Sequence, residues 1–162
     1  MKTYIGTKLI HAVAMTRQAY NDFRGWQLPA NEDGTDEGFL VEYLDGGKPN
    51  VEGMAGYVSW SPKEQFENAY RTVDGLSFGL AVEALKLGRK VARAGWNGKG
   101  MFLLLVPGST FKVNRDPLLS IYPEGTEINY RPHIDMKTAD GEIVPWVASQ
   151  SDLLVDDWQI VE

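Results

Sequence analysis

The chain has 162 residues, of which 43% are hydrophobic, and this length is enough for one ordinary domain or two very small ones. A formal net charge of −6 argues against binding to DNA, because a protein that grips the phosphates needs a basic face. Two histidines and no cysteine argue against a structural zinc site, and no motif indicates a metal or a cofactor.

The first half of the chain predicts a strand, a short helix and two more strands. Residues 4–15 have the β-branched and aromatic content of a strand. Thr16 then stands where a helix N-cap is expected, and Gly25 stands where that helix would end. An acidic loop follows, and two apolar runs after it predict strands at residues 39–43 and 56–60.

The stretch SPKE at 61–64 predicts the start of a second helix. Ser61 is in the position of an N-cap, Pro62 fits the first helical position, and Glu64 completes a capping box. A break near residues 72–75 indicates a linker.

The second half predicts a helix over 77–88, capped by Ser77, and a strand over 89–96. Residues 101–108 are too apolar to expose either face, so we place them centrally in a sheet. Residues 109–141 are rich in proline and turn residues. The remaining expected elements are a strand at 142–148, a short helix at 149–154 and a terminal strand at 157–162.

These elements indicate the α+β class, with small antiparallel sheets and short helices. Both halves contain a helix, a Gly-Trp pair, an apolar strand, a strand that leads to a tryptophan, and another short helix. That order suggests two related α+β units in tandem. No apolar run approaches the roughly 20 residues of a membrane span and no signal peptide opens the chain, so we expect a cytoplasmic protein that does not bind membranes.

The stretch GWNGKG at 95–100 is the first candidate site. Its glycines let backbone N–H groups approach a ligand, and Trp96 offers a flat face for a base. Asn97 can bond a base edge or a ribose hydroxyl, and Lys99 and Arg93 supply charge for a phosphate. The alternative is a β-turn whose tryptophan packs on the core, and chemistry alone leaves the two interpretations about equal.

The second candidate is the alternation of Arg131, His133 and Asp135, which would point the same way in an extended segment. The three groups suit a phosphate with a sugar hydroxyl, or acid–base work in which Asp135 orients His133. From spacing alone, an exposed strand edge with a surface ion pair is the simpler interpretation.

The third candidate is residues 145–152, where Gln150 and Asp152 would lie at a helix start that favours an anion. Simple capping is the simpler interpretation of this stretch. Trp146, which precedes it, is a further aromatic candidate. No P-loop, nucleophile elbow, paired-histidine motif or cysteine nucleophile is present, so the chain is expected not to be an enzyme.

The second half resembles the Thoeris anti-defence 2 family, a small phage and prophage domain. The resemblance spans residues 76–162 and rests on RKVARAGWNGKGM (89–101), VPGSTFKVNRDPLL (106–119), YRPHIDMKTADG (130–141) and VPWVASQSDLLVDDW (144–158). Residues 1–73 resemble another small phage module, through MTRQAYNDFRGW and YVSWSPK, for which no role is implied.

The resemblance implies a phage-encoded protein of the host bacterial cytoplasm. Its expected partner is a cyclic nucleotide signal of the glycocyclic ADP-ribose type, which it would bind and sequester as a sponge, without cleaving it. Some relatives also take up cyclic dinucleotides, and the family assembles as homo-oligomers, dimers or tetramers, with ligand at subunit contacts. The resulting ligand-binding candidates are Arg93, Trp96, Asn97, Lys99, Arg131, His133, Asp135, Trp146, Gln150 and Asp152.

Two other functions stay open at this point. One is a phosphodiesterase-like enzyme that cleaves the same signal with His133 as acid or base, although no second histidine lies nearby in the sequence. The other is an acidic decoy that binds a host defence protein, although the acidic residues do not form one run.

Overall fold

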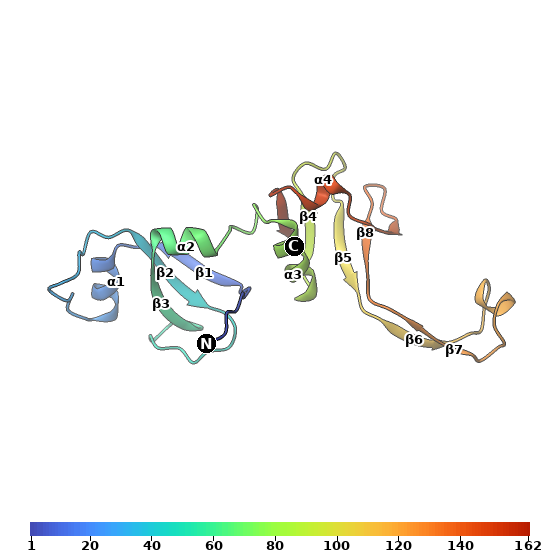
Figure 1. Ribbon diagram of the computed structural model, residues 1–162, viewed down its shortest axis with the longest axis horizontal. Helices are drawn as coiled ribbons and strands as arrows, with labels where there is room; N and C mark the ends of the chain where they lie inside the picture. The colour runs from blue at the N-terminus through green and yellow to red at the C-terminus, as the bar shows by residue number, and fades with distance from the viewer. The chain divides into compact units, whose positions relative to one another are not determined.

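The computed structural model describes residues 1–162, and these divide into two compact units, Met1–Arg71 and Thr72–Glu162 (Figure 1). Unit 1 denotes the first and unit 2 the second. Both contain short helices and small antiparallel sheets, which confirms the α+β class.

Unit 1 is a three-stranded antiparallel sheet in the order β1-β2-β3, with two helices. Tyr20 of the first helix packs with Leu40 and Val58 in a buried cluster, whereas Phe39 stacks on Phe66 of the second helix at 4.0 Å. Because Phe39 and Leu40 are neighbours in one strand, the two helices cover opposite faces of the sheet. The elements are β1 (Ile10–Ala14), α1 (Arg17–Arg24), β2 (Gly38–Tyr43), β3 (Tyr57–Pro62) and α2 (Lys63–Ala69).

The predicted limits of α1 are confirmed. The Thr16 hydroxyl accepts a hydrogen bond from the backbone N–H of Ala19, and Gly25 ends the helix with φ of 66°. The strand expected over 4–15 forms only from Ile10, which pairs with Tyr43, the last residue of β2. Residues before Ile10 therefore have no strand to pair with.

The predicted capping box at 61–64 is wrong. Ser61 belongs to β3 and pairs with Phe39, so its backbone is committed to the sheet. Pro62 is the N-cap of α2 and makes no side-chain capping bond. The residue types at 61–64 do match a capping box, but the pairing of Ser61 in the sheet takes precedence over this local pattern.

Unit 2 contains a five-stranded antiparallel sheet in the order β10-β4-β5-β8-β9, which confirms the central position expected for the apolar run 101–108. The strand order differs from that of unit 1, so the tandem relationship of the two halves stays a prediction. The elements are α3 (Phe78–Lys86), β4 (Lys90–Arg93), β5 (Phe102–Val106), β6 (Ser109–Lys112), the 3₁₀ turn η1 (Leu118–Ser120), β7 (Glu127–Tyr130), β8 (His133–Lys137), β9 (Ile143–Pro145), α4 (Gln150–Leu153) and β10 (Trp158–Val161).

The core of unit 2 lies between α3 and one face of this sheet. Leu85 of α3, Val91 of β4 and Leu103 of β5 are at most 1% exposed, and Trp158 of β10 is fully buried among them. Alternation along β5 turns Phe102, Leu104 and Val106 to the opposite face. The other helix, α4, packs against α3, so that second face, called the open face below, has no helix over it.

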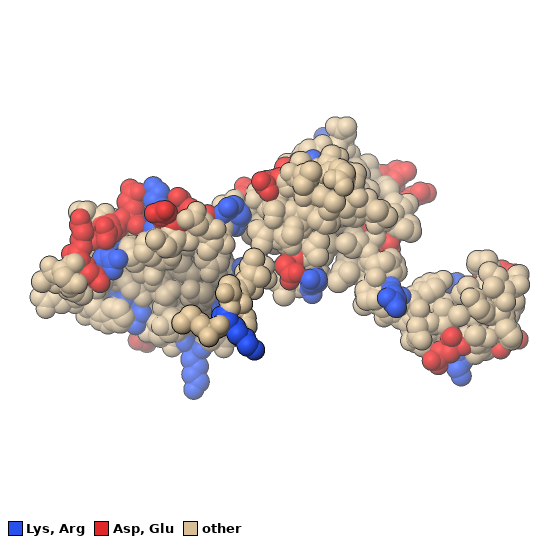
Figure 2. All heavy atoms as spheres, viewed as in Figure 1, with Lys and Arg blue, Asp and Glu red and all other residues tan.

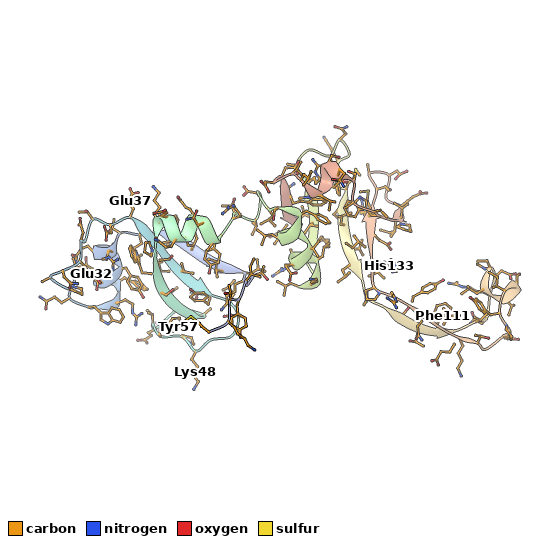
Figure 3. The ribbon with its side chains drawn as sticks, in the orientation of Figure 1. Glu32, Glu37, Lys48, Tyr57, Phe111 and His133 are labelled. Atoms are coloured by element: carbon orange, nitrogen blue, oxygen red, sulfur yellow. The ribbon has the colours of Figure 1, made fainter.

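A two-stranded arm extends beyond the five-stranded sheet, where β6 continues from β5 and β7 leads into β8 (Figure 1). The arm has its own small apolar centre, in which Val113 is 1% exposed and Phe111 packs edge-on against Tyr130 at 5.1 Å (Figure 3). The turn-rich composition of 109–141 did not predict these strands. None of the helices in either unit is long and apolar enough for a membrane crossing.

Candidate functional site

The stretch GWNGKG forms the tight connection between β4 and β5. Gly100 has φ of 70°, a conformation that a side chain disfavours. A Cβ on Gly98 would overlap the Met101 sulfur and would lie 3.0 Å from Cβ of Ala139. The bare backbone therefore lets the loop fold closely onto its neighbours.

The loop borders a hollow of about 430 Å³ at the ends of β4, β5 and β10. Arg93, Trp96, Asn97 and Lys99, four of the predicted binding residues, line it. A volume of this size is in the range of small-molecule sites. The structure adds lining residues that the sequence did not single out, chiefly Phe102 and Gln159.

Trp96 is half-buried, and its ring meets the buried Trp158 edge-on, with centroids 5.5 Å apart. Trp146 is also half-buried and meets Trp158 edge-on at 6.0 Å. Two partly accessible indoles therefore contact one buried indole. This arrangement combines both interpretations of Trp96, because its ring packs on the core and still lines the hollow.

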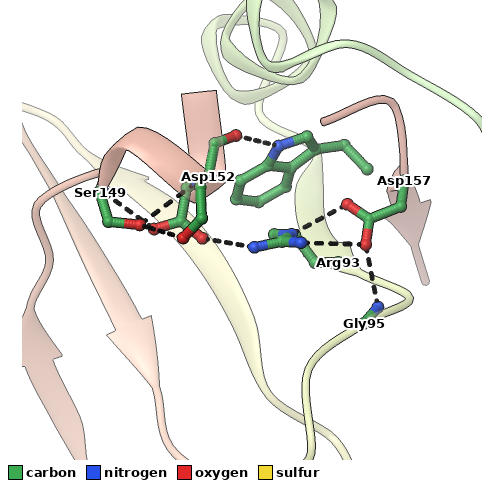
Figure 4. A network of polar contacts seen from close by, with 7 residues as sticks. Arg93, Gly95, Ser149, Asp152 and Asp157 are labelled. Atoms are coloured by element: carbon green, nitrogen blue, oxygen red, sulfur yellow. Dashed lines mark hydrogen bonds and ion pairs between the residues drawn. The ribbon is translucent and has the colours of Figure 1, made fainter. Parts of the chain in front are cut away.

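Arg93 lies at the centre of a polar network at the base of the loop (Figure 4). Its Nε and Nη2 donate to the two carboxylate oxygens of Asp157 at 2.9 and 3.2 Å, and its Nη1 donates to Asp152 at 2.8 Å. Asp157 also accepts from the backbone N–H of Gly95 at 3.1 Å. The network thus ties the loop to both ends of the segment from α4 to β10.

The carboxylates of this network are held in their charged form. Hydrogen bonds from Arg93 are the main cause of the lowered pKa of Asp157. Burial acts to raise the pKa of Asp152, but hydrogen bonds from Ser149 and Arg93 outweigh it, so this pKa is also lowered. Asp152 and Ser149 form the capping box of α4, which accounts for both side chains in structural terms.

His133 and Asp135 share a face of β8, and His133 Nε2 lies 3.7 Å from Asp135 Oδ1. That oxygen is buried and has no hydrogen-bond partner. The backbone carbonyl of Arg131 lies 3.1 Å from His133 Nδ1, while the Arg131 side chain is exposed and lies outside β8. The expected common direction therefore holds for His133 and Asp135, which are in one strand.

Six of the ten predicted residues form three groups of two. Arg93 joins Asp152, Trp96 joins Trp146 through Trp158, and His133 joins Asp135. The side chains of Arg131 and Gln150 are exposed, and neither contacts another candidate through a hydrogen bond or an ion pair. No group of three or more histidine and acidic side chains is arranged to hold a metal ion.

Sequence reasoning missed a cation pair around Phe102. The ammonium groups of Lys90 and Lys137 lie 5.1 and 5.8 Å from the centroid of its ring. Lys137 is the strand partner of Phe102, so both side chains are on the open face. Alternation along β5 and β8 was the signal that could have placed them together.

The fold and this arrangement define a class: a compact α+β domain with aromatic, amide and cationic side chains around a ligand-sized hollow. The chain belongs to the Thoeris anti-defense 2-like family, whose sequence model matches residues 76–161, more than half of its length. Thoeris anti-defense 2 of Bacillus phage SP01 is 44% identical over 91 residues, which cover 53% of this chain and 94% of that relative. The function class is therefore phage anti-defence, carried by unit 2, and the matches leave unit 1 uncovered.

Proposed function

We propose that the protein is a sponge, which binds a cyclic ADP-ribose-type immune signal and sequesters it without cleaving it. The observation that carries the proposal is the hollow of about 430 Å³ bordered by the half-buried Trp96 together with Asn97 and Lys99. The family membership of residues 76–161 supports the same function. The site of action would be the cytoplasm of the infected bacterium.

The side chains around the hollow offer a complementary group for each part of such a ligand. Trp96 would stack on the base, and Asn97 would bond the base edge or a ribose hydroxyl. Lys99 lines the hollow, and Lys90 and Lys137 flank Phe102 at its border, so the three ammonium groups would face the phosphates. Arg93 and Asp152 would act by holding the loop, since their charges already satisfy each other.

A sponge must hold a scarce signal tightly, and a nanomolar Kd corresponds to about −12 kcal/mol. Such affinity requires that the protein enclose the ligand well, and a single small domain rarely provides that enclosure. We therefore propose a homo-oligomer, dimer or tetramer, in which a second subunit closes the site. The half-buried apolar side chains of Leu104 and Val106 and the unpaired oxygen of Asp135 on the open face support this assembly.

The enzyme alternative would use His133 and Asp135 on the same ligand. Their separation of 3.7 Å is compatible with orientation of the imidazole, but no second acid–base pair accompanies them on β8. The decoy alternative would use the acidic surface of unit 1, where carboxylates gather around α2 and the 29–38 loop (Figure 2). Three of these, Glu32, Asp36 and Glu37, are already paired with cations.

The test is to incubate the protein with cyclic ADP-ribose isomers and, separately, with cyclic dinucleotides, and then to remove free ligand. Heating the complex and analysing the supernatant by chromatography separates the functions. A sponge returns the intact ligand in stoichiometric amount, whereas an enzyme returns a linear product. A protein that retains none of these nucleotides contradicts the proposal and leaves the decoy function.

A further inference from the structure

Unit 1 carries a hollow of its own, of about 350 Å³, lined by Lys8, Tyr43, Asp45, Tyr57 and Ser59. Tyr43 and Tyr57 are direct partners across β2 and β3, and their ring centroids lie 6.3 Å apart. We propose that this hollow, the tyrosine hollow, binds an uncharged polyhydroxylated ring, the chemistry shared by a pyranose sugar and a ribose.

The aromatic side chains of the tyrosine hollow lie outside the buried cluster of unit 1. The buried cluster of this unit consists of Tyr20, Leu40 and Val58. Tyr57 is 48% exposed, although it is a large aromatic residue (Figure 3). Exposed tyrosines are typical of binding surfaces, and the C–H groups of a sugar ring pack well on an electron-rich aromatic face.

The polar groups of the tyrosine hollow match the hydroxyls of such a ring. Lys8 Nζ donates to Asp45 Oδ2 at 2.6 Å and lies 4.9 Å from the centroid of the Tyr43 ring. Ser59 Oγ donates to the Tyr43 hydroxyl at 3.4 Å. The hollow therefore presents a donor, an acceptor and the three hydroxyls of Tyr43, Tyr57 and Ser59, which do both, and neighbouring sugar hydroxyls also donate and accept.

The charge of the tyrosine hollow selects against phosphate. Lys8 and Asp45 cancel each other, so the pair exerts little net attraction on an anion. Their side chains are 48% and 49% exposed, and an ion pair in water contributes little stability. A ligand hydroxyl can therefore take the place of either partner of the ion pair at a small cost in free energy. An uncharged ligand gains most from this replacement.

The test uses the full chain and follows the ring resonances of Tyr43 and Tyr57 by NMR. One arm titrates methyl glycosides of glucose, galactose and N-acetylglucosamine, a second titrates adenosine and uridine, and a third titrates inorganic phosphate. A saturable shift of these rings in the first arm identifies a pyranose, and one in the second arm alone identifies a ribonucleoside. The phosphate arm is expected to leave the rings unchanged.

Variants decide whether the hollow is the binding site. Tyr57→Ala is expected to weaken binding about tenfold, which corresponds to about 1.4 kcal/mol, while Tyr57→Phe keeps the ring and most of the affinity. Asp45→Asn removes the charge with little change of shape and is expected to weaken binding as well. Tyr122→Ala removes a comparably exposed tyrosine of unit 2 and serves as the matched control.

Two results overturn the proposal. One is that no glycoside or nucleoside moves the two tyrosine rings. The other is that Tyr57→Ala, or Asp45→Asn where the alanine variant fails to fold, binds as tightly as the unmodified chain. Neither result bears on the nucleotide site of unit 2, because Trp96 and its neighbours belong to the other unit.

Discussion

Arg93 and Asp157 meet through two hydrogen bonds, Nε to Oδ1 at 2.9 Å and Nη2 to Oδ2 at 3.2 Å. The two residues are 64 positions apart in the chain, so the pair joins β4, the strand before the glycine loop, to the residue that precedes β10, the last strand of the fold. The Arg93 side chain is 15% exposed, which protects the pair from much of the competition by water.

Replacement of Arg93 by methionine is expected to lower the free energy of unfolding of unit 2 by about 1–3 kcal/mol, because it leaves Asp152 and Asp157 unpaired. Urea denaturation followed by near-ultraviolet circular dichroism measures the change. Lys86→Met, which breaks the exposed ion pair with Glu83, is the control and is expected to cost less than about 0.5 kcal/mol. Equal losses of unfolding free energy in the two variants would contradict the prediction that the Arg93 network stabilises unit 2 more than an exposed ion pair does.

The same pair predicts a dependence of stability on pH. The pKa of Asp157 is lower in the folded protein than in the unfolded chain, where it is about 3.9. Its stabilising contribution is therefore complete above the unfolded pKa and is lost as the pH falls through the folded pKa. Asp157→Asn is expected to flatten the acid limb of a plot of unfolding free energy against pH. The control variant Asp156→Asn changes an exposed neighbour and should leave the decrease of unfolding free energy at acid pH unaltered.

Trp96→Ala is expected to weaken nucleotide binding by about 1–3 kcal/mol, the range for one lost stacking platform. Calorimetric titration with cyclic ADP-ribose isomers measures it. Because Trp96 also packs on Trp158, some loss of thermal stability accompanies the loss of affinity. Trp26→Ala, an exposed tryptophan of unit 1, is the matched control. A Trp96 variant that melts earlier and still binds with full affinity would assign the ring to the core alone.

Leu104→Asp is expected to convert the proposed homo-oligomer into a monomer, since it places a charge on the open face that a second subunit would cover. Light scattering at micromolar concentration distinguishes a monomer of 18.1 kDa from its multiples. Val13→Asp changes an exposed apolar residue of unit 1 and should leave the mass unaltered. Full-affinity binding by an unmodified chain that is already monomeric would exclude a shared site.

A fragment that starts at residue 72 is expected to fold without unit 1. Leu76 exchanges two backbone hydrogen bonds with Trp158, and the carbonyl of Val73 accepts from the N–H of Ile160. A fragment that starts at 77 loses these partners of β10 and should unfold at a lower temperature. Circular dichroism of both fragments makes the comparison, and equal melting temperatures would show that residues 72–76 are dispensable.

Sequence reasoning succeeded where the determinants are local. The caps at Thr16 and Ser77 depend on a hydroxyl within three residues of the N–H that it binds, and both are present. The run 102–106 needed only its apolar content to be placed centrally in the sheet. The same locality explains the error at Ser61, where the competing partner, Phe39, lies far away in the chain.

The candidate site was predictable in part for the same reason. A glycine-rich turn with Trp96 and Asn97 indicated a binding loop, and both residues line a hollow. The alternation along 131–135 brought His133 to Asp135. The partners that fix the loop, Asp152 of α4 and Asp157 just before β10, are distant in the chain, so nothing near Arg93 in the sequence indicated that they would engage it.

The glycines of the loop are constrained for different reasons, and this difference has an evolutionary consequence. A methyl group on Gly95 would lie 2.8 Å from the Asp157 carboxylate, and one on Gly98 would overlap Met101, whereas Gly100 is limited by its positive φ. Substitution of Gly100 by asparagine, which tolerates that φ, should therefore occur among relatives. Gly98 should change only together with a smaller residue at 101. In related phages under host selection, the first glycine should stay fixed as long as the carboxylate at 157 does.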